Sequence, residues 1–170
     1  MSSVAAEAAA LFDPRIAGWM REQAQALVAD TPFHRFCGLH LLRLEPGLCR
    51  LGFTATPETL VMQAYLHGGI LTALLEPAAF LALLTALEPS ERPVTVDLNV
   101  QQMRAIPAGS DVLIEGKLER RARNLAFCES RAYVDGKLTS VARMTKSIQA
   151  ASPAPASASA PVPPPPTAAA

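Results

Sequence analysis

The spacing of apolar residues predicts an amphipathic helix near the start of the chain. Between Asp13 and Asp30, apolar side chains recur every three or four residues, as on one face of a helix: Ile16, Trp19, Met20, Ala24 and Leu27. Asp13-Pro14 offers a capping carboxylate followed by a first-turn proline, so we expect the helix to begin there. Thr31-Pro32 is expected to end it.

A hairpin and a second helix are predicted next. Gly38–Leu44 and Leu48–Thr54 have the composition of short strands, and Glu45-Pro46-Gly47 between them is typical of a turn. From about His67 to Leu87 the chain is almost continuously apolar, which predicts a long buried helix.

The second half of the chain has the pattern of consecutive strands. One strand alternates apolar and polar residues, and its predicted buried face carries Val94, Val96, Leu98 and Val100. Further strands are predicted over 112–118, 125–134 and 138–148, the last two joined by the hairpin turn Asp135-Gly136. Together these elements predict an α+β fold, in which an antiparallel sheet of about five to six strands wraps round a long central helix beside an extra N-terminal helix.

Length and composition divide the chain into three parts. The 170 residues suffice for one domain, which we expect over 33–149, after an N-terminal helical segment over 1–32. Residues 150–170 are almost entirely Ala, Ser and Pro, so a disordered, extended tail is expected there. Such a tail either docks into a partner protein or stays solvated.

The charge balance gives no support for a nucleic-acid or membrane partner. The 15 Lys and Arg residues equal the 15 Asp and Glu residues, and a net charge of zero favours neither nucleic acid nor an anionic membrane. The apolar stretch Ile70–Leu87 contains Glu76 and Pro77, so we expect a buried helix and no membrane span. The first ten residues contain no basic residue and no sustained apolar run, so no export signal is expected.

The cysteines and histidines predict neither a disulfide framework nor a metal site. Cys37, Cys49 and Cys128 are odd in number and form no Cys-x-x-Cys pair, so they are interpreted as reduced thiols of a cytoplasmic protein. His34 and His40 have no ligand-forming neighbours at metal-binding spacing.

The candidate chemistry lies at the start of the long helix, in His67-Gly68-Gly69 and the acid that follows. First-turn N–H groups have no partner inside a helix, and with the helix dipole they suit a carbonyl oxygen that becomes negative during acyl transfer. Glu76 is a lone carboxylate on an apolar face, so burial is expected to raise its pKa. Pro77 deprives the Ala73 carbonyl of its helical partner and is expected to open space there.

The spacing of these residues predicts a dimer. Glu76 follows Gly68 by eight residues, which is about 12 Å along a helix axis. One thioester cannot contact both groups. Two antiparallel copies of the helix across a two-fold axis would bring Gly68 of one copy to Glu76 of the other.

Residues 33–148 resemble the hot-dog-fold acyl-CoA thioesterases, specifically the phenylacetate-pathway (PaaI) type of the 4-hydroxybenzoyl-CoA thioesterase superfamily. The resemblance rests on His67-Gly68-Gly69 with Glu76, the strand over 94–100, Arg104–Gly109 and Asp135-Gly136. The resemblance implies hydrolysis of an acyl-CoA, with an aryl or medium-chain acyl group, to free acid and CoA. It implies no cofactor, since coenzyme A is part of the substrate, and a homodimer or a dimer of dimers.

The resemblance also implies residue roles. The Gly68 N–H would polarise the carbonyl, and Glu76 of the neighbouring subunit would be nucleophile or general base. Thr95 matches a position that often carries a hydroxyl near the reacting group. The sequence departs from the family at Val61, where Asn or Gln is usual and Gln63 is a nearby substitute, and at Pro77.

The remaining candidates have weaker support. His67 is a candidate for orienting the loop or for direct chemistry, Phe80 for lining a pocket, and the basic turn after Arg120 for binding CoA phosphates, although a solvated hairpin would look the same. The further substrate-binding candidates are Gly69, Arg104, Arg121, Arg123 and Asn124.

Three alternatives stay open: a non-catalytic acyl-CoA sensor on the same fold, a hot-dog dehydratase, and an interaction protein that uses its proline-rich tail. The dehydratase would need an Asp and His pair, and no such spacing is found.

Overall fold

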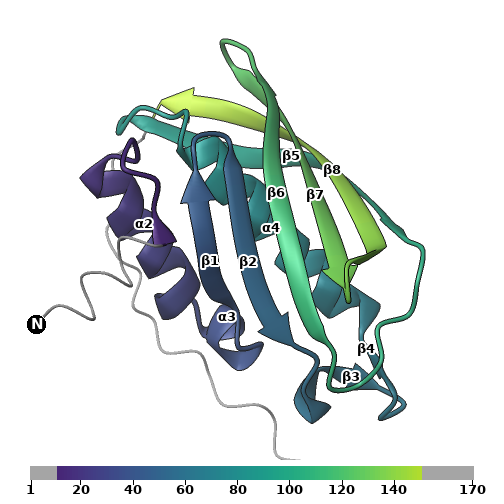
Figure 1. Ribbon diagram of the computed structural model, residues 1–170. Coiled ribbons are helices and arrows are strands. Elements are labelled where there is room, and N and C mark those ends of the chain that lie inside the picture. The colour runs from purple at the N-terminus through teal and green to yellow at the C-terminus, as the bar shows by residue number, and fades with distance from the viewer. Residues whose placement is uncertain (1–10, 151–170) are drawn as a thin grey trace, which may run out of the picture.

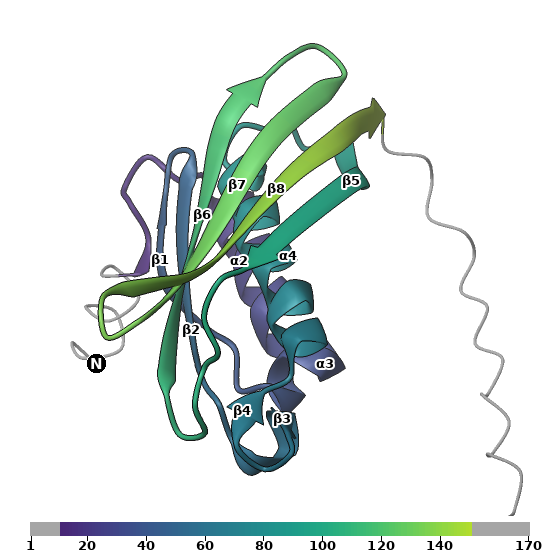
Figure 2. The same cartoon turned by 90° about the vertical axis from the view of Figure 1, so that its right-hand side faces the viewer.

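The computed structural model describes residues 11–150, and its centre is a six-stranded antiparallel sheet curved round one helix (Figure 1). The strand order is β1-β2-β6-β7-β8-β5. The strands are β1 (His40–Glu45), β2 (Leu48–Thr54), β5 (Glu91–Gln102), β6 (Asp111–Arg121), β7 (Leu125–Val134) and β8 (Lys137–Ala150). The helices are α2 (Gly18–Asp30), α3 (Pro32–Phe36) and α4 (Gly68–Leu84). All three helices lie on one face of the sheet (Figure 2), which confirms the predicted architecture.

A small two-stranded sheet adjoins the start of α4. It follows a 3₁₀ turn, η1 (Pro57–Thr59), and pairs β3 (Leu60–Val61) with β4 (Tyr65–Leu66). Such short strands carry no alternation that a sequence pattern could reveal, and they were not predicted.

The helix α4 is apolar round most of its circumference because it packs inside the curve of the sheet. Leu74, Leu75 and Leu81 are fully buried. The closest approach of helix and sheet is at Gly116 on β6, where a Cβ atom would lie 2.1 Å from the carbonyl oxygen of Ala78. Only glycine fits there, so this residue sets how deeply the helix sits in the sheet.

The N-terminal helix is shorter than predicted. It begins at Gly18, with Ala17 as an N-cap that makes no side-chain bond, so the predicted cap at Asp13 is wrong. The Asp13 N–H donates instead to the Leu44 carbonyl of β1, because Phe12 forms a parallel bridge with Leu44 of that strand. The helix packs through Ala24 and ends before Thr31 as predicted, but a second short helix, α3, follows directly.

The predicted burial of β5 is also wrong in part. A register shift between Thr95 and Asp97 interrupts its pairing with β8, as in a β-bulge. Thr95 pairs with the buried Lys146, whereas Val94 and Val96 are 48% and 60% exposed. The one extra residue changes which side chains face α4, although the alternation in the sequence runs on unbroken.

The two predicted hairpins are confirmed. β1 pairs with β2, and β7 turns into β8 through Asp135 and Gly136, which have φ of 49° and 71° as this two-residue turn requires. The predicted tail lies, beyond Ala150, outside the described residues. Within 11–150 no helix combines the length and apolar character that a bilayer crossing requires.

Candidate active site

The Glu76 carboxylate belongs to a three-residue polar cluster between α4 and the sheet. Thr95 on β5 donates from Oγ1 to Glu76 Oε1 at 2.8 Å. The ammonium group of Lys146 on β8 also donates to Oε1, and to Thr95 Oγ1 at 2.7 Å. The cluster thus joins the helix to two adjacent strands.

The structure reverses the expected pKa shift of Glu76. Burial raises the pKa of this carboxyl, but the hydrogen bond and charge of Lys146, with the hydrogen bond from Thr95, outweigh burial and bring the pKa below its ordinary value. The expected rise assumed an unpaired carboxylate, and Glu76 is paired. Its side chain remains 38% exposed, so the ionised group is both stabilised and accessible.

Lys146 was not predicted, although its signal was present in the sequence. In β8 the residues that face α4 alternate as Ser140, Ala142, Met144, Lys146 and Ile148. A lysine in phase with buried residues, with its side chain 1% exposed, needs a charged partner. That partner is Glu76.

The start of α4 presents one unpaired donor. His67 is the N-cap, and its Nδ1 accepts a hydrogen bond from the Gly69 N–H at 2.9 Å. The expectation that all first-turn donors are free therefore fails at Gly69. Among residues 11–150 the Gly68 N–H has no hydrogen-bond partner. The Nδ1 atom of His67 is therefore occupied by the backbone.

Gln102, another residue not predicted, lies against Gly68. Its Nε2 donates to the Gly68 carbonyl at 2.7 Å and to Thr72 Oγ1 at 3.1 Å. A Cβ at position 68 would lie 2.6 Å from Gln102 Oε1, so a glycine leaves room for this amide. The bulge in β5 puts Gln102 on the helix-facing side of the strand.

Gln63 does not contact the Glu76 cluster. It lies exposed at the β3–β4 turn, where Met62 and Gln63 have φ of 53° and 55°. Val61, at the position of the missing family amide, is 42% exposed in β3. Within one copy of the chain, Gln102 is the amide that lies beside Gly68.

Two further side chains lie near the cluster. Phe80, one turn after Glu76, is half-buried, and the Lys146 ammonium stands over its ring at 5.8 Å from the centroid. His34 on α3 is buried, with Nδ1 at 2.8 Å from the Leu27 carbonyl oxygen, and contributes to lowering the pKa of Glu76. Phe80, which was predicted to line a pocket, therefore lies beside the lysine of the cluster.

The candidate phosphate ligands do not come together in one copy of the chain. Arg121 pairs with Glu91 at the first residue of β5, and Arg123 and Asn124 follow it in the β6–β7 turn. Arg104 follows the last residue of the same strand. A strand of this length spans about 36 Å, so the two groups lie at opposite ends of it.

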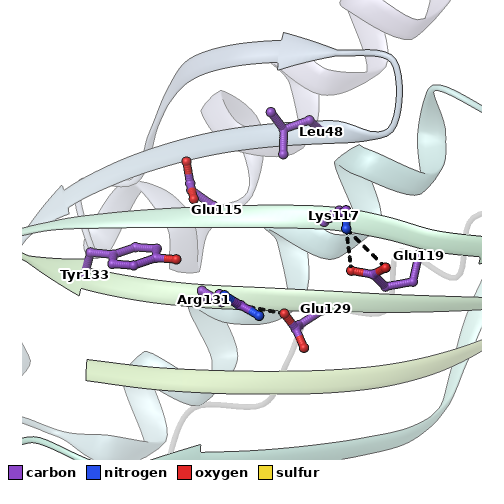
Figure 3. Close-up of a pocket in the computed structure, with 7 residues that line it drawn as sticks. All are labelled: Leu48, Glu115, Lys117, Glu119, Glu129, Arg131 and Tyr133. Carbon is purple, nitrogen blue, oxygen red and sulfur yellow. Dashed lines mark hydrogen bonds and ion pairs between the residues drawn. The ribbon is translucent and has the colours of Figure 1, made fainter. Parts of the chain in front are cut away.

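The outer face of the sheet carries a second set of charges. A hollow there is lined by Leu48, Glu115, Lys117, Glu119, Glu129, Arg131 and Tyr133 (Figure 3). Lys117 pairs with Glu119, and Arg131 with Glu129. These side chains alternate with buried ones that face α4, so the hollow lies on the opposite side of the sheet from Glu76.

The next features concern metal-binding groups and the three cysteines. No group of three or more His, Cys, Asp or Glu residues within 11–150 is arranged to hold a metal ion. Cys37, Cys49 and Cys128 are free and buried, and burial raises the pKa of Cys128 to about 11, so this thiol is neutral near neutral pH.

Comparisons with known proteins agree with the fold. The family described as Thioesterase superfamily matches residues 63–141, which include His67, Gly68 and Glu76. Acyl-coenzyme A thioesterase 13 of Homo sapiens is 27% identical over 132 residues, 76% of this chain and 94% of that protein.

Solved structures extend the similarity. A mutant of the phenylacetic acid degradation protein PaaI from Thermus thermophilus is 26% identical, with a TM-score of 0.64 over 69% of this chain and 98% of that one. Zebra fish thioesterase superfamily member 2 is 28% identical, with a TM-score of 0.66 over 74% and 93%. A thioesterase family protein from Silicibacter pomeroyi, 20% identical with a TM-score of 0.70 over 78% and 99%, shares the fold.

Proposed function

Because this chain is a hot-dog-fold acyl-CoA thioesterase of the PaaI type, we propose that it cleaves its substrate between two copies of itself, with Glu76 of one copy as the acting carboxylate and the Gly68 N–H of the other polarising the thioester carbonyl. The observation that carries this proposal is the state of Glu76. It is an ionised carboxylate, partly exposed and held at one oxygen, on the same helix as an unpaired N–H donor.

The distance between the two groups supports a site shared by two copies. Gly68 and Glu76 lie on one helix at positions about 12 Å apart along its axis, too far to contact one carbonyl group. An antiparallel second copy of α4 would bring the complementary group within reach at two equivalent sites.

The edge of the sheet supports the same assembly. β5 pairs with β8 on one side, and its other side has no strand partner among the described residues. Val94, Val96 and Leu98 expose apolar surface along this strand. A long apolar edge is an unfavourable surface for a monomer and a favourable one for pairing with a second chain.

An antiparallel pairing of two β5 edges would also join the separated arginines. The end of β5 that precedes Arg104 in one copy would lie beside the start of β5 in the other, where Arg121 is paired with Glu91. Arg123 and Asn124 belong to that same end. We propose that these groups from both copies bind the phosphates of coenzyme A, since guanidinium groups suit phosphate oxygens.

The reaction follows from the free carboxylate oxygen. Either Glu76 attacks the thioester carbon, the C–S bond breaks and CoA leaves as thiolate before water hydrolyses the anhydride, or Glu76 takes a proton from the water that attacks. In both routes the carbonyl oxygen gains negative charge at Gly68. Single-turnover hydrolysis in ¹⁸O-labelled water distinguishes the routes, because only the anhydride route leaves label in Glu76.

The substrate class rests on Phe80 and the apolar surroundings of the cluster. We propose an aryl or medium-chain acyl group that packs against this ring. A panel of acyl-CoA esters, followed by release of free thiol, ranks the candidates.

Subunit mixing tests the shared site. Glu76→Gln removes the carboxylate, and Gly68→Val places methyl groups where Gln102 and the substrate carbonyl lie. Each variant alone is expected to be nearly inactive. A hybrid of the two has one site with both changes and one with neither, so an equal mixture regains about a quarter of wild-type activity.

The controls decide between rival outcomes. If the site lay within one copy, no mixture would recover activity. If the protein were a non-catalytic acyl-CoA sensor, the wild type would bind acyl-CoA, and the wild type and Glu76→Gln would release thiol at the same background rate. A monomer at micromolar concentration in sedimentation would also contradict the proposal.

A further inference from the structure

Lys146 is the most deeply buried charged residue of the Glu76 cluster. Its side chain is 1% exposed, and it occupies an inward-facing position of β8, between Met144 and Ile148. Placing an ammonium group among apolar neighbours costs free energy, which pairing offsets only in part. Lys146 takes no part in the proposed reaction of Glu76 and Gly68 with the thioester.

The two oxygens of the Glu76 carboxylate differ in their hydrogen bonds. Lys146 and Thr95 both donate to Oε1 of Glu76, and Lys146 also donates to Thr95 Oγ1, which closes a triangle of hydrogen bonds. Among residues 11–150 no donor reaches the other oxygen, Oε2. One oxygen is therefore fixed, and the other is left to a reaction partner.

Among residues 11–150, Lys146 is the one cation that hydrogen-bonds directly to the Glu76 carboxylate. On β5, Thr95 is neutral. On α3, His34 adds a weaker attraction from a greater distance, and on β7 the Cys128 thiol beside Lys146 is neutral because burial raises its pKa. Arg143, the nearest other cation of β8, is exposed and pairs with Glu129 on the outer face.

We propose that Lys146 is a positioning residue of the thioesterase reaction: it keeps Glu76 ionised and, together with Thr95, anchors Oε1, so that Oε2 is the oxygen presented to the thioester or to the attacking water. This role rests on the proposed function of Glu76. Lys146 itself lies behind the carboxylate, in the core of the domain, and touches no substrate.

The predicted signature is a change in pH dependence. Lys146→Met keeps the length of the side chain and removes the charge, which leaves Glu76 with the effect of burial largely unopposed. The pKa of an acid that loses such a partner rises by about one to three units. The acidic limb of kcat/KM is therefore expected to move to higher pH by at least about one unit, with at least a tenfold loss on that limb and an unchanged KM.

Lys137→Met is the matched control, since Lys137 lies on the same strand with an exposed side chain. Its pH profile should coincide with that of the wild type. Lys146→Gln, which keeps a hydrogen-bond donor without the charge, is a second test if Lys146→Met does not fold, and the same displaced limb is expected. An unmoved acidic limb, or an equal loss of activity at every pH, would overturn the proposal.

A readout that needs no activity separates this inference from the proposed function. In the full-length protein labelled with ¹³C at glutamate carboxyl groups, Glu76→Gln identifies the Glu76 resonance. It should titrate below the ordinary glutamate range in the wild type and above it in Lys146→Met. If both proteins titrate alike, Lys146 does not have this role. If the resonance shifts as expected but wild-type protein hydrolyses no acyl-CoA, the proposed function fails, and the pairing of Lys146 with Glu76 remains.

Discussion

The two faces of the sheet use the same kind of ion pair in opposite surroundings. On the outer face, Lys117 and Glu119 have side chains that are 60% and 43% exposed, and water solvates both charges. On the inner face, Lys146 is 1% and Glu76 38% exposed, and the surrounding residues are apolar. Exposed pairs contribute little to stability, whereas buried charges require partners and are costly to separate.

The difference shows where a charge needs a functional explanation. The outer charges alternate with inward-facing apolar residues, as expected for a solvated face. An apolar residue would pack between Met144 and Ile148 at lower cost than Lys146 does.

The largest expected effect is on turnover. Glu76→Gln removes the carboxylate that we propose attacks the thioester or accepts a proton, and it should lower kcat by about 10²–10⁴-fold. Glu119→Gln on the outer face should leave kcat within about twofold. Thiol release from the preferred acyl-CoA measures both, and equal losses in the two variants would abolish the contrast between the faces.

The second largest expected effect is on stability, through the packing of α4 against the inner face of the sheet. Gly116→Ala places a methyl group against the Ala78 carbonyl and should lower the free energy of unfolding by about 3 kcal/mol or more, because backbone on both sides must move. Gly18→Ala is the control, since a Cβ there meets nothing within 4 Å. Denaturant unfolding of both variants measures the difference, and a Gly116→Ala protein as stable as the wild type would contradict the close approach.

The ion pairs themselves should differ by a smaller amount. Lys146→Met leaves a partly exposed carboxylate unpaired, so a loss of about 2 kcal/mol is expected, between the values for surface and fully buried pairs. Lys117→Met should change stability by less than about 0.5 kcal/mol. In a double-mutant cycle, adding Glu76→Gln to Lys146→Met should restore part of the loss, and additive effects would argue against coupling.

The smallest effect concerns acid stability. The fold lowers the pKa of Glu76, so this group stabilises the folded state above its unfolded pKa of about 4.3, and the contribution is lost as pH falls through the lower folded value. In Glu76→Gln, the fall in thermal midpoint below about pH 4 should be slightly shallower than in the wild type. Parallel curves would show that Glu76 is not preferentially ionised by folding.

Much of the fold could be predicted from sequence because local patterns and tertiary structure agree. The start of α4 at His67 and the turn at Asp135-Gly136 follow from short-range chemistry. The cap at Asp13 failed because a long-range contact with Leu44 takes that residue. The faces of β5 failed because a single inserted residue leaves the sequence alternation intact while turning the strand over.

Only some residues of the candidate site could be proposed from the sequence. Glu76, Gly68 and Thr95 could be identified from a motif and a resemblance, and the structure brings Thr95 to Glu76. Lys146 was overlooked although its place in the β8 alternation was readable. Gln102 could not be identified in advance, because its approach to Gly68 depends on the bulge.

The strand order has a consequence for synthesis on the ribosome. Among residues 11–150, β5 joins the sheet only through β8, the last strand described, and Lys146 follows its partner Glu76 by 70 residues. Until β8 has left the exit tunnel, β5 has no neighbour and the central helix carries an uncompensated negative charge. The nascent chain therefore completes its fold and its carboxylate cluster in one late step, and a truncation before Ser140 removes both the pairing of β5 and the lysine of the cluster.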